Sequence, residues 1–419
     1  MANFSWLLAE RGWRVLLGLA VSLIVSRYLG PTNLGLLAYA FSLCAIVGTV
    51  AGFGIEDVVA RELVLKPEAA RSLLAMGMRI KLMGAAVAFA LAIAAGWLWR
   101  PGDWPALGLV AWVAAGFFFA PSDLVELWYQ ARERMKAPAL ARQLAMVASA
   151  AVRLGLVAGG APLWCFAAAA AVEAALVATG LTLLWFFGDP RPVADGPGGE
   201  LRITLGQMLR EGWPLLGSGA LVVITMHCDR LLLVRFAGET EVGIYAAAVR
   251  LTELMHVLPV ALGAALLPRL AAFHAGDRTS YLRLARKTGI TVIAMTGVIA
   301  GLCFLLAPWL IPALLGEDFR ASVGVWRVQV WTLVFIAIVS IRSRLWVVEG
   351  KTRWILAISA VTAGVNVAGN LWLIPTWGAM GAAWSGLLAW TMSAVVWPWF
   401  SPESARFMRR WCGLEIAAR

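Results

Sequence analysis

Long runs without a charged residue recur along the whole sequence. They cover residues 82–99, 104–122, 154–172, 212–228, 288–316 and 354–402. About 20 apolar residues in a helix cross the hydrocarbon core of a bilayer, so runs of this length predict membrane-spanning helices. The last run is long enough for two helices. The segment Ile374-Pro375-Thr376-Trp377-Gly378 divides it, because proline and glycine interrupt a helix.

Other stretches tolerate an internal charge, and the complete pattern predicts about twelve helices. They are expected near 12–29, 34–54, 74–99, 106–127, 141–159, 163–187, 213–235, 244–270, 288–313, 322–345, 354–374 and 379–400. A Pro/Gly-rich stretch, 188–200, interrupts the pattern at the midpoint and has the composition of a linker. The expected domains are an N-terminal six-helix lobe (1–187), a cytoplasmic linker (188–212), a C-terminal six-helix lobe (213–400) and a cytoplasmic tail (401–419).

The composition excludes several classes of protein. Hydrophobic residues make up 61% of the chain and charged residues 14%, whereas soluble proteins have about 45–50% and 25%. The net charge of +11 is assigned to cytoplasmic loops rather than to nucleic-acid binding. The five cysteines and three histidines show no metal-ligand spacing, so neither a metal nor another cofactor is expected.

The distribution of basic residues predicts the orientation. With both termini in the cytoplasm, most of the 35 lysines and arginines fall in inward-facing segments, as the positive-inside rule requires. The sequence therefore predicts a multi-pass protein of the bacterial inner membrane.

Two segments in the two halves share one pattern. Arg27, Gly30 and Gly35 recur as Arg235, Gly238 and Gly243, at a constant separation of 208 residues. An aromatic residue follows each arginine, and a threonine follows it at the fifth position. Each copy would close the first hairpin of its half. Six helices is an even number, so the two halves would enter the membrane the same way up, as parallel repeats with a substrate site between them.

The sequence resembles the Wzx-type polysaccharide flippases (O-antigen or exopolysaccharide) of the multidrug/oligosaccharidyl-lipid/polysaccharide (MOP) exporter superfamily. The resemblance covers nearly the whole chain. The segments that carry it are SRYLGPTNLGLLAYAFSL, DRLLLVRFAGETEVGIYAAAVRLTE, PVALGAALLPRL and NVAGNLWLIPTWGAMGAAWSGLLAW. It implies two lobes around a central cavity, alternating access, and an undecaprenyl-diphosphate-linked oligosaccharide as cargo. It also implies a polysaccharide polymerase and glycosyltransferases as partners.

Charged residues inside predicted helices are the candidate site, because an ionisable group in the membrane needs a partner, a cavity or a function. The densest group is Asp229 and Arg230 in the seventh helix with Arg250, Glu253 and His256 in the eighth. One interpretation is a polar stripe facing a cavity, in which Arg250 and Arg230 bind a diphosphate or glycan. The other is ion pairing between the two helices.

Arg14, Asn366 and Asn370 complete the candidate substrate-binding residues. Arg14 lies one turn into the first helix and can give two hydrogen bonds to a phosphate, or can act as an inside-positive anchor. The two asparagines lie one turn apart and either join helices or contact the glycan. For coupling to an ion gradient, the candidates are Asp123, Glu126, Glu173 and Asp229, together with Glu253.

The sequence thus predicts an all-α membrane protein of two parallel six-helix repeats, acting as a monomer to flip a lipid-linked oligosaccharide across the bilayer. The main alternative is a multidrug or small-solute antiporter of the same superfamily, which would have few internal arginines. A membrane polymerase or glycosyltransferase is less compatible, because no predicted outer loop exceeds about ten residues.

Overall fold

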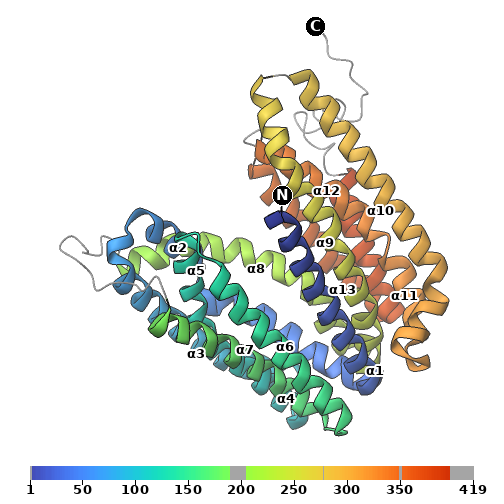
Figure 1. Ribbon diagram of the computed structural model, residues 1–419. Coiled ribbons are helices and arrows are strands. Elements are labelled where there is room, and N and C mark those ends of the chain that lie inside the picture. Colours follow the sequence, from blue (N-terminus) through green and yellow to red (C-terminus); the bar gives the residue numbers. More distant parts are fainter. Residues whose placement is uncertain (1, 189–203, 277, 349–351, 397–419) are drawn as a thin grey trace. The chain divides into compact units, whose positions relative to one another are not determined.

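A computed structural model describes residues 2–188, 204–276, 278–348 and 352–396, and every regular element in them is helical (Figure 1). The helices of the first half are α1 (Ala2–Gly52), α2 (Ile55–Leu65), α3 (Ala70–Trp99), α4 (Trp104–Ala115), α5 (Asp123–Ala131), α6 (Lys136–Ala158) and α7 (Leu163–Phe187). Those of the second half are α8 (Leu205–Phe236), α9 (Glu239–Gly276), α10 (Arg278–Leu315), α11 (Ser322–Gln329), α12 (Thr332–Val348) and α13 (Thr352–Thr391). The predicted all-α fold is confirmed.

The lengths of these helices suit a membrane. Eight segments of the described chain are long and apolar enough to cross a bilayer. Two of them, with 50 and 40 residues, are each long enough for two crossings. Helices α8 and α9 carry ionisable residues and are longer than a single crossing requires. The described helices therefore accommodate the expected number of spans.

Glycines divide two of the long helices where the sequence predicts a break. Helix α1 turns at Gly30, which has φ 69° and precedes Pro31. Helix α13 turns at Gly378, with φ 52°, a few residues after Pro375. Both φ values lie in the left-handed region that glycine adopts without steric cost, so each of these helices consists of two helical segments joined by a tight turn.

Several predicted boundaries are corrected by the structure. Helices α8 to α10 extend beyond the predicted apolar ranges, because the hydrophobic pattern marks only the part of a helix that is in contact with lipid. Residues 55–65, expected to be a loop, form α2. The buried side chains of α2, Ile55, Val58, Val59 and Leu63, recur with helical spacing.

The chain forms two compact units, and the boundaries between them fall inside α1 and α8. Unit 1 comprises Met1–Leu29 and Leu36–His227, and unit 2 comprises Gly30–Gly35 and Cys228–Arg419. Helix α8 thus contributes to both units, with its first part in unit 1. The lobes drawn from the sequence, 1–187 and 213–400, stay a prediction.

Each unit has its own apolar core. In unit 1, side chains of α2, α3 and α5 pack together, with Trp128 and Tyr129 among the largest buried residues. In unit 2, Tyr281 of α10, Trp346 of α12 and Ile358 of α13 belong to one buried cluster. The core of unit 1 includes α5, the helix that carries Asp123 and Glu126.

Within unit 2, the two repeated glycine segments lie against each other. The hydroxyls of Thr32 and Thr240 are 2.9 Å apart, which is a hydrogen bond between equivalent residues of the repeat. Gly35 lies against the carbonyl group of Glu239, so closely that no β-carbon would fit. Gly243 lies against the carbonyl group of Pro31 in the same way. The equivalent arginines, Arg27 and Arg235, are exposed.

Candidate functional site

The charged cluster of unit 2 is built on α8 and α9. The chain turns at Gly238, so the last residues of α8 lie beside the first turns of α9. Asp229 is buried and accepts a hydrogen bond from the hydroxyl of Tyr245, and a second from the backbone nitrogen of Arg230 at 2.7 Å. The guanidinium of Arg230 lies 3.1 Å from a carboxylate oxygen of Glu253. The structure therefore brings Asp229, Arg230 and Glu253 together.

The two partners of the Arg230–Glu253 pair differ in exposure. The side chain of Arg230 is 11% exposed, whereas that of Glu253 is 52% exposed. Arg250, one turn before Glu253, is exposed, and His256, one turn after it, is half-buried. The described contacts link α9 to α8 through Glu253, which is the cross-helix pairing that the sequence left open. The positions of Arg250 and His256 add two more polar groups to the same helix.

Asn366 and Asn370 lie within a buried polar cluster of unit 2. The side-chain nitrogen of Asn370 donates to the side-chain oxygen of Asn366 at 3.1 Å. The Cys228 thiol lies 3.4 Å from that oxygen, and Ser385 donates to the backbone carbonyl of Asn366 at 2.8 Å. These bonds join α8 and the two segments of α13. This geometry supports helix packing as one role of the asparagines, and substrate contact stays a prediction.

The acidic residues of unit 1 are paired with arginines of α6. The guanidinium of Arg142 lies 2.9 Å from Asp123 and 2.5 Å from Glu126. Arg153 lies 2.5 Å from Glu173, which also accepts a hydrogen bond from Ser149 at 2.9 Å. All five charged side chains are half-buried or marginally exposed. Their role in ion coupling stays a prediction.

Two buried basic residues were missed as site candidates. Lys81 of α3 is 2% exposed and lies 2.6 Å from Glu56 of α2. Arg342 of α12 is fully buried, and one of its nitrogens donates to the carbonyl oxygen of Ala394 at 3.0 Å. Lys81 comes directly before the uncharged run 82–99, and Arg342 lies near the end of the predicted helix 322–345. For the Lys81–Glu56 pair, the sequence signal was a lysine inside a predicted helix that follows an amphipathic segment, residues 55–65.

Some residues of the predicted site and linker lie outside the described part of the structure. Arg14 belongs to α1, but its side chain is not among those described. The greater part of the linker, 189–203, and the tail from residue 397 onward also lie outside the described residues. Their predicted roles stay predictions.

Among the described residues, the charged side chains of the candidate site neutralise one another within the helical units. The described residues contain no group of three potential metal ligands. Each acid considered above has a cationic or hydroxyl partner. Such pairing lowers the cost of placing charge in a membrane.

The fold is similar to that of solved transporters of the MOP superfamily. An inward-facing multidrug resistance transporter of the MATE family in this superfamily aligns with TM-score 0.73, 17% identity and coverage of 94% of this chain and 96% of that one. The lipid II flippase MurJ, in an inward closed conformation, aligns with TM-score 0.73, 13% identity and coverage of 98% and 90%. A MOP transporter from Pyrococcus furiosus gives TM-score 0.61, 15% identity and coverage of 96% and 95%.

Sequence models show the family. Residues 1–274 match the model described as polysaccharide biosynthesis protein, and residues 199–412 match the model of the lipid II flippase MurJ. The chain belongs to the polysaccharide biosynthesis protein family. No curated protein shows a significant match to the chain. The family and the fold together show a membrane transporter rather than an enzyme.

Proposed function

We propose that the protein flips an undecaprenyl-diphosphate-linked oligosaccharide from the cytoplasmic to the periplasmic leaflet of the inner membrane. The observation that carries this proposal is that two family models cover the chain from both ends and overlap. One is named for polysaccharide biosynthesis and the other for a lipid II flippase. A transporter related to both handles a glycan attached to a lipid.

The arginines supply the chemistry that such a cargo needs. An unpaired anion faces a free-energy penalty of tens of kcal/mol in a medium of low dielectric constant. Arg230 is held at its place by Glu253, a partner that is itself half exposed. Arg250 is exposed on α9, the helix that carries Glu253. In the proposed mechanism, Arg250 and at least one of Arg14 and Arg230 bind the diphosphate, because a guanidinium can give it two hydrogen bonds at once.

The proposed cycle is alternating access with both termini in the cytoplasm. Single-cysteine variants, in a background whose native cysteines have been replaced, test the orientation with a membrane-impermeant reagent. Gly196 and Arg409, both outside the described residues, are expected to react only from the cytoplasmic side. Glu239 and Asp318 are expected to react only from the periplasmic side. One reversed position would contradict the proposed topology.

Transport itself is tested with purified protein in vesicles that contain a fluorescent undecaprenyl-diphosphate oligosaccharide. The expected result is that the protein makes the glycan in the inner leaflet accessible to a lectin added outside. Protein-free vesicles and vesicles with an unrelated membrane protein are the controls. Lectin access no faster than in these controls would refute the proposed function.

The role of Arg250 is tested by surface polysaccharide in cells at equal protein level. Arg250→Ala is expected to abolish export, and Arg250→Lys to restore it in part, since lysine keeps the charge but loses the forked geometry. Arg320→Ala is the matched control, because Arg320 is 79% exposed and pairs only with Glu317 three residues away in the described contacts. Full export by Arg250→Ala would refute a diphosphate-binding role.

A second candidate function, multidrug antiport, is favoured by the fold that the chain shares with MATE transporters. The described acids argue against it, because Asp123, Glu126 and Glu173 are each paired with an arginine. Drug accumulation in cells that overproduce the protein separates the two functions. A fall in accumulation without any effect on surface polysaccharide would favour the antiporter.

A further inference from the structure

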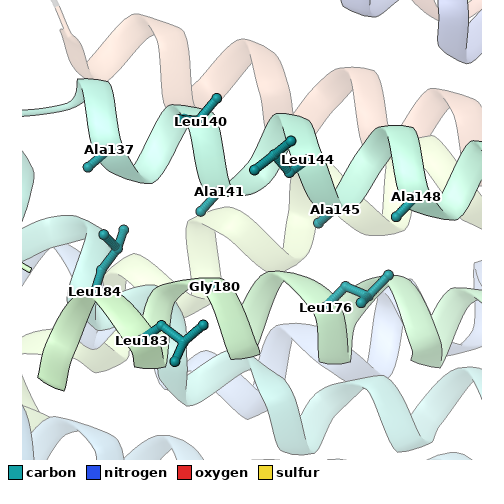
Figure 2. Close-up of a pocket in the computed structure, with 10 residues that line it drawn as sticks. All are labelled: Ala137, Leu140, Ala141, Leu144, Ala145, Ala148, Leu176, Gly180, Leu183 and Leu184. Atoms are coloured by element: carbon teal, nitrogen blue, oxygen red, sulfur yellow. The ribbon is translucent and has the colours of Figure 1, made fainter. Parts of the chain in front are cut away.

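An apolar groove lies on unit 1 between α6 and α7. Figure 2 shows its lining, with alanines of α6 pointing toward α7, which contributes Leu176, Gly180, Leu183 and Leu184. Its volume is about 440 Å³, within the range of roughly 300–1,000 Å³ found for small-molecule sites. All ten lining residues are alanine, leucine or glycine. Such a groove suits a hydrocarbon chain.

The groove is narrow because small residues bring the two helices together. A β-carbon added to Gly180 would lie 3.0 Å from that of Ala141, so the helices are in close contact there. Leu140, Leu144 and Leu183 stand at the edges of the groove and are 57%, 62% and 53% exposed. The lining on α6 runs from Ala137 to Ala148, or about 17 Å at 1.5 Å per residue. A long and narrow space of this kind fits one chain.

One end of the groove meets a basic segment. Arg132, Arg134 and Lys136 are exposed and come directly before Ala137, the first lining residue of α6. The guanidinium of Arg132 lies 4.5 Å from the ring centroid of Trp128, which holds it beside the start of the helix. Glu133 is the single acid in this segment, so its net charge is positive. The charge complements an anionic headgroup at the end of the apolar groove.

We propose that this groove holds the part of the polyprenyl tail nearest the headgroup of the lipid-linked cargo, while the basic segment attracts the diphosphate. This inference rests on the proposed function and adds to it the place where the tail binds. A polyprenyl diphosphate has a single tail and a headgroup of high negative charge, whereas a bilayer phospholipid has two tails and a single phosphate. The single groove and its basic end therefore match the cargo better than they match bulk lipid.

Photo-crosslinking tests the occupant directly. Benzoylphenylalanine is placed at Leu144, a lining residue at the edge of the groove, or at Val147, which is exposed on the same helix but is not part of the lining. The full-length protein is irradiated in phosphatidylglycerol vesicles containing a small fraction of undecaprenyl diphosphate. We expect polyprenyl adducts at residue 144 to be enriched several-fold over the fraction of this lipid, with bulk composition at residue 147. Bulk composition at both positions would overturn the proposal.

Filling the groove with a large side chain tests whether transport requires the bound lipid tail. Ala148→Trp places a large side chain in the lining, and Ala151→Trp places the same side chain at an exposed position of α6 outside it. We expect transport of the lipid-linked oligosaccharide to fall several-fold in Ala148→Trp and to be unchanged in Ala151→Trp, at equal thermal stability. Equal transport by both variants would overturn the proposal.

The two tests also separate this inference from the proposed function. If wild-type protein transports no oligosaccharide in vesicles, the proposed function fails, whatever the adducts at residue 144 contain. If wild-type protein transports it but residue 144 shows only bulk lipid, the groove proposal alone fails. Should Ala148→Trp not fold, the crosslinking comparison, which leaves the alanines unchanged, decides the matter.

Discussion

Replacing Gly243 by alanine should destabilise unit 2 through a single added methyl group. Gly243 is buried within α9, and an added β-carbon would overlap the carbonyl oxygen of Pro31. Its backbone conformation is not left-handed, so alanine itself fits the helix. The obstacle is backbone rather than the end of a flexible side chain, so it cannot move away by changing rotamer. The substitution therefore isolates the contact between the two glycine segments.

The magnitude follows from the cost of overpacking. Inserting a methyl group into a packed region costs about 1–3 kcal/mol, and the rigid neighbour places Gly243→Ala toward the upper end. A unit of about 150–250 residues loses roughly 2–4 °C of Tm per kcal/mol. We therefore expect the Tm of the purified protein, followed by tryptophan fluorescence, to fall by about 4–12 °C. Gly35→Ala should cost a similar amount, because it meets the carbonyl of Glu239 in the same way.

The double variant gives a sharper test. A shift that accommodates one β-carbon also opens space for the other, so the two losses should sum to less than additivity predicts. Gly297→Ala is the matched control, since nothing lies within 4 Å of its added β-carbon and alanine favours a helix by up to about 1 kcal/mol. If Gly243→Ala melted at the same temperature as Gly297→Ala, the close contact would be refuted.

Three further predictions concern buried polar groups. Tyr245→Phe removes a hydrogen bond from the buried carboxylate of Asp229 and should lower stability by about 1–3 kcal/mol, as measured by thermal unfolding. Arg342→Met should leave Tm unchanged or raise it, because two of the buried guanidinium nitrogens have no hydrogen-bond partner in the described structure. Lys81→Met should also be neutral or stabilising, since it removes a buried ammonium. The partner Glu56 is half-exposed, so no buried carboxylate is left without a partner.

Two exposed residues provide controls for these predictions. Tyr28→Phe removes a more exposed hydrogen bond, to the carbonyl of Ala161, and should cost less than Tyr245→Phe. Arg320→Met changes an exposed arginine and should change the free energy of unfolding by no more than about 0.5 kcal/mol. Equal losses for the two tyrosines would contradict the first prediction. A large drop in Tm for Arg342→Met or Lys81→Met would show that the cation has stronger partners than the structure provides.

The sequence predicts the helices well because membrane spans depend on local composition. The break in α13 follows from Pro375 and Gly378 alone, and the turn at Gly30 follows from the repeat. Helix α2 was missed because its eleven residues are too short and too charged for a membrane span, although Ile55, Val59 and Leu63 follow a helical period. Span detection favours length and hydrophobicity over amphipathic spacing.

The sequence offers ion pairing between helices as one interpretation but does not choose the partner of each charge, because the partners depend on which helices pack together. Asp123 and Glu126 share a helical face, but their partner Arg142 lies on α6, at the start of the predicted helix 141–159. Glu253 was expected beside Arg250 and is paired with Arg230 of α8. A single sequence predicts which residues share a face of one helix. The contacts between helices depend on the packing of side chains over the whole unit.

The contact between the glycine segments has the form of an interface between two identical subunits. Residue Pro31 meets Gly243, and its equivalent Glu239 meets Gly35, the equivalent of Gly243. The hydrogen bond between Thr32 and Thr240 joins a residue to its own counterpart. This reciprocity defines an isologous contact about a two-fold axis, as in a symmetric dimer. Unit 2 therefore contains a self-complementary contact between the two repeated segments. Each residue in this contact has its equivalent 208 residues away, so a substitution at one position can be matched by the same substitution at the equivalent position.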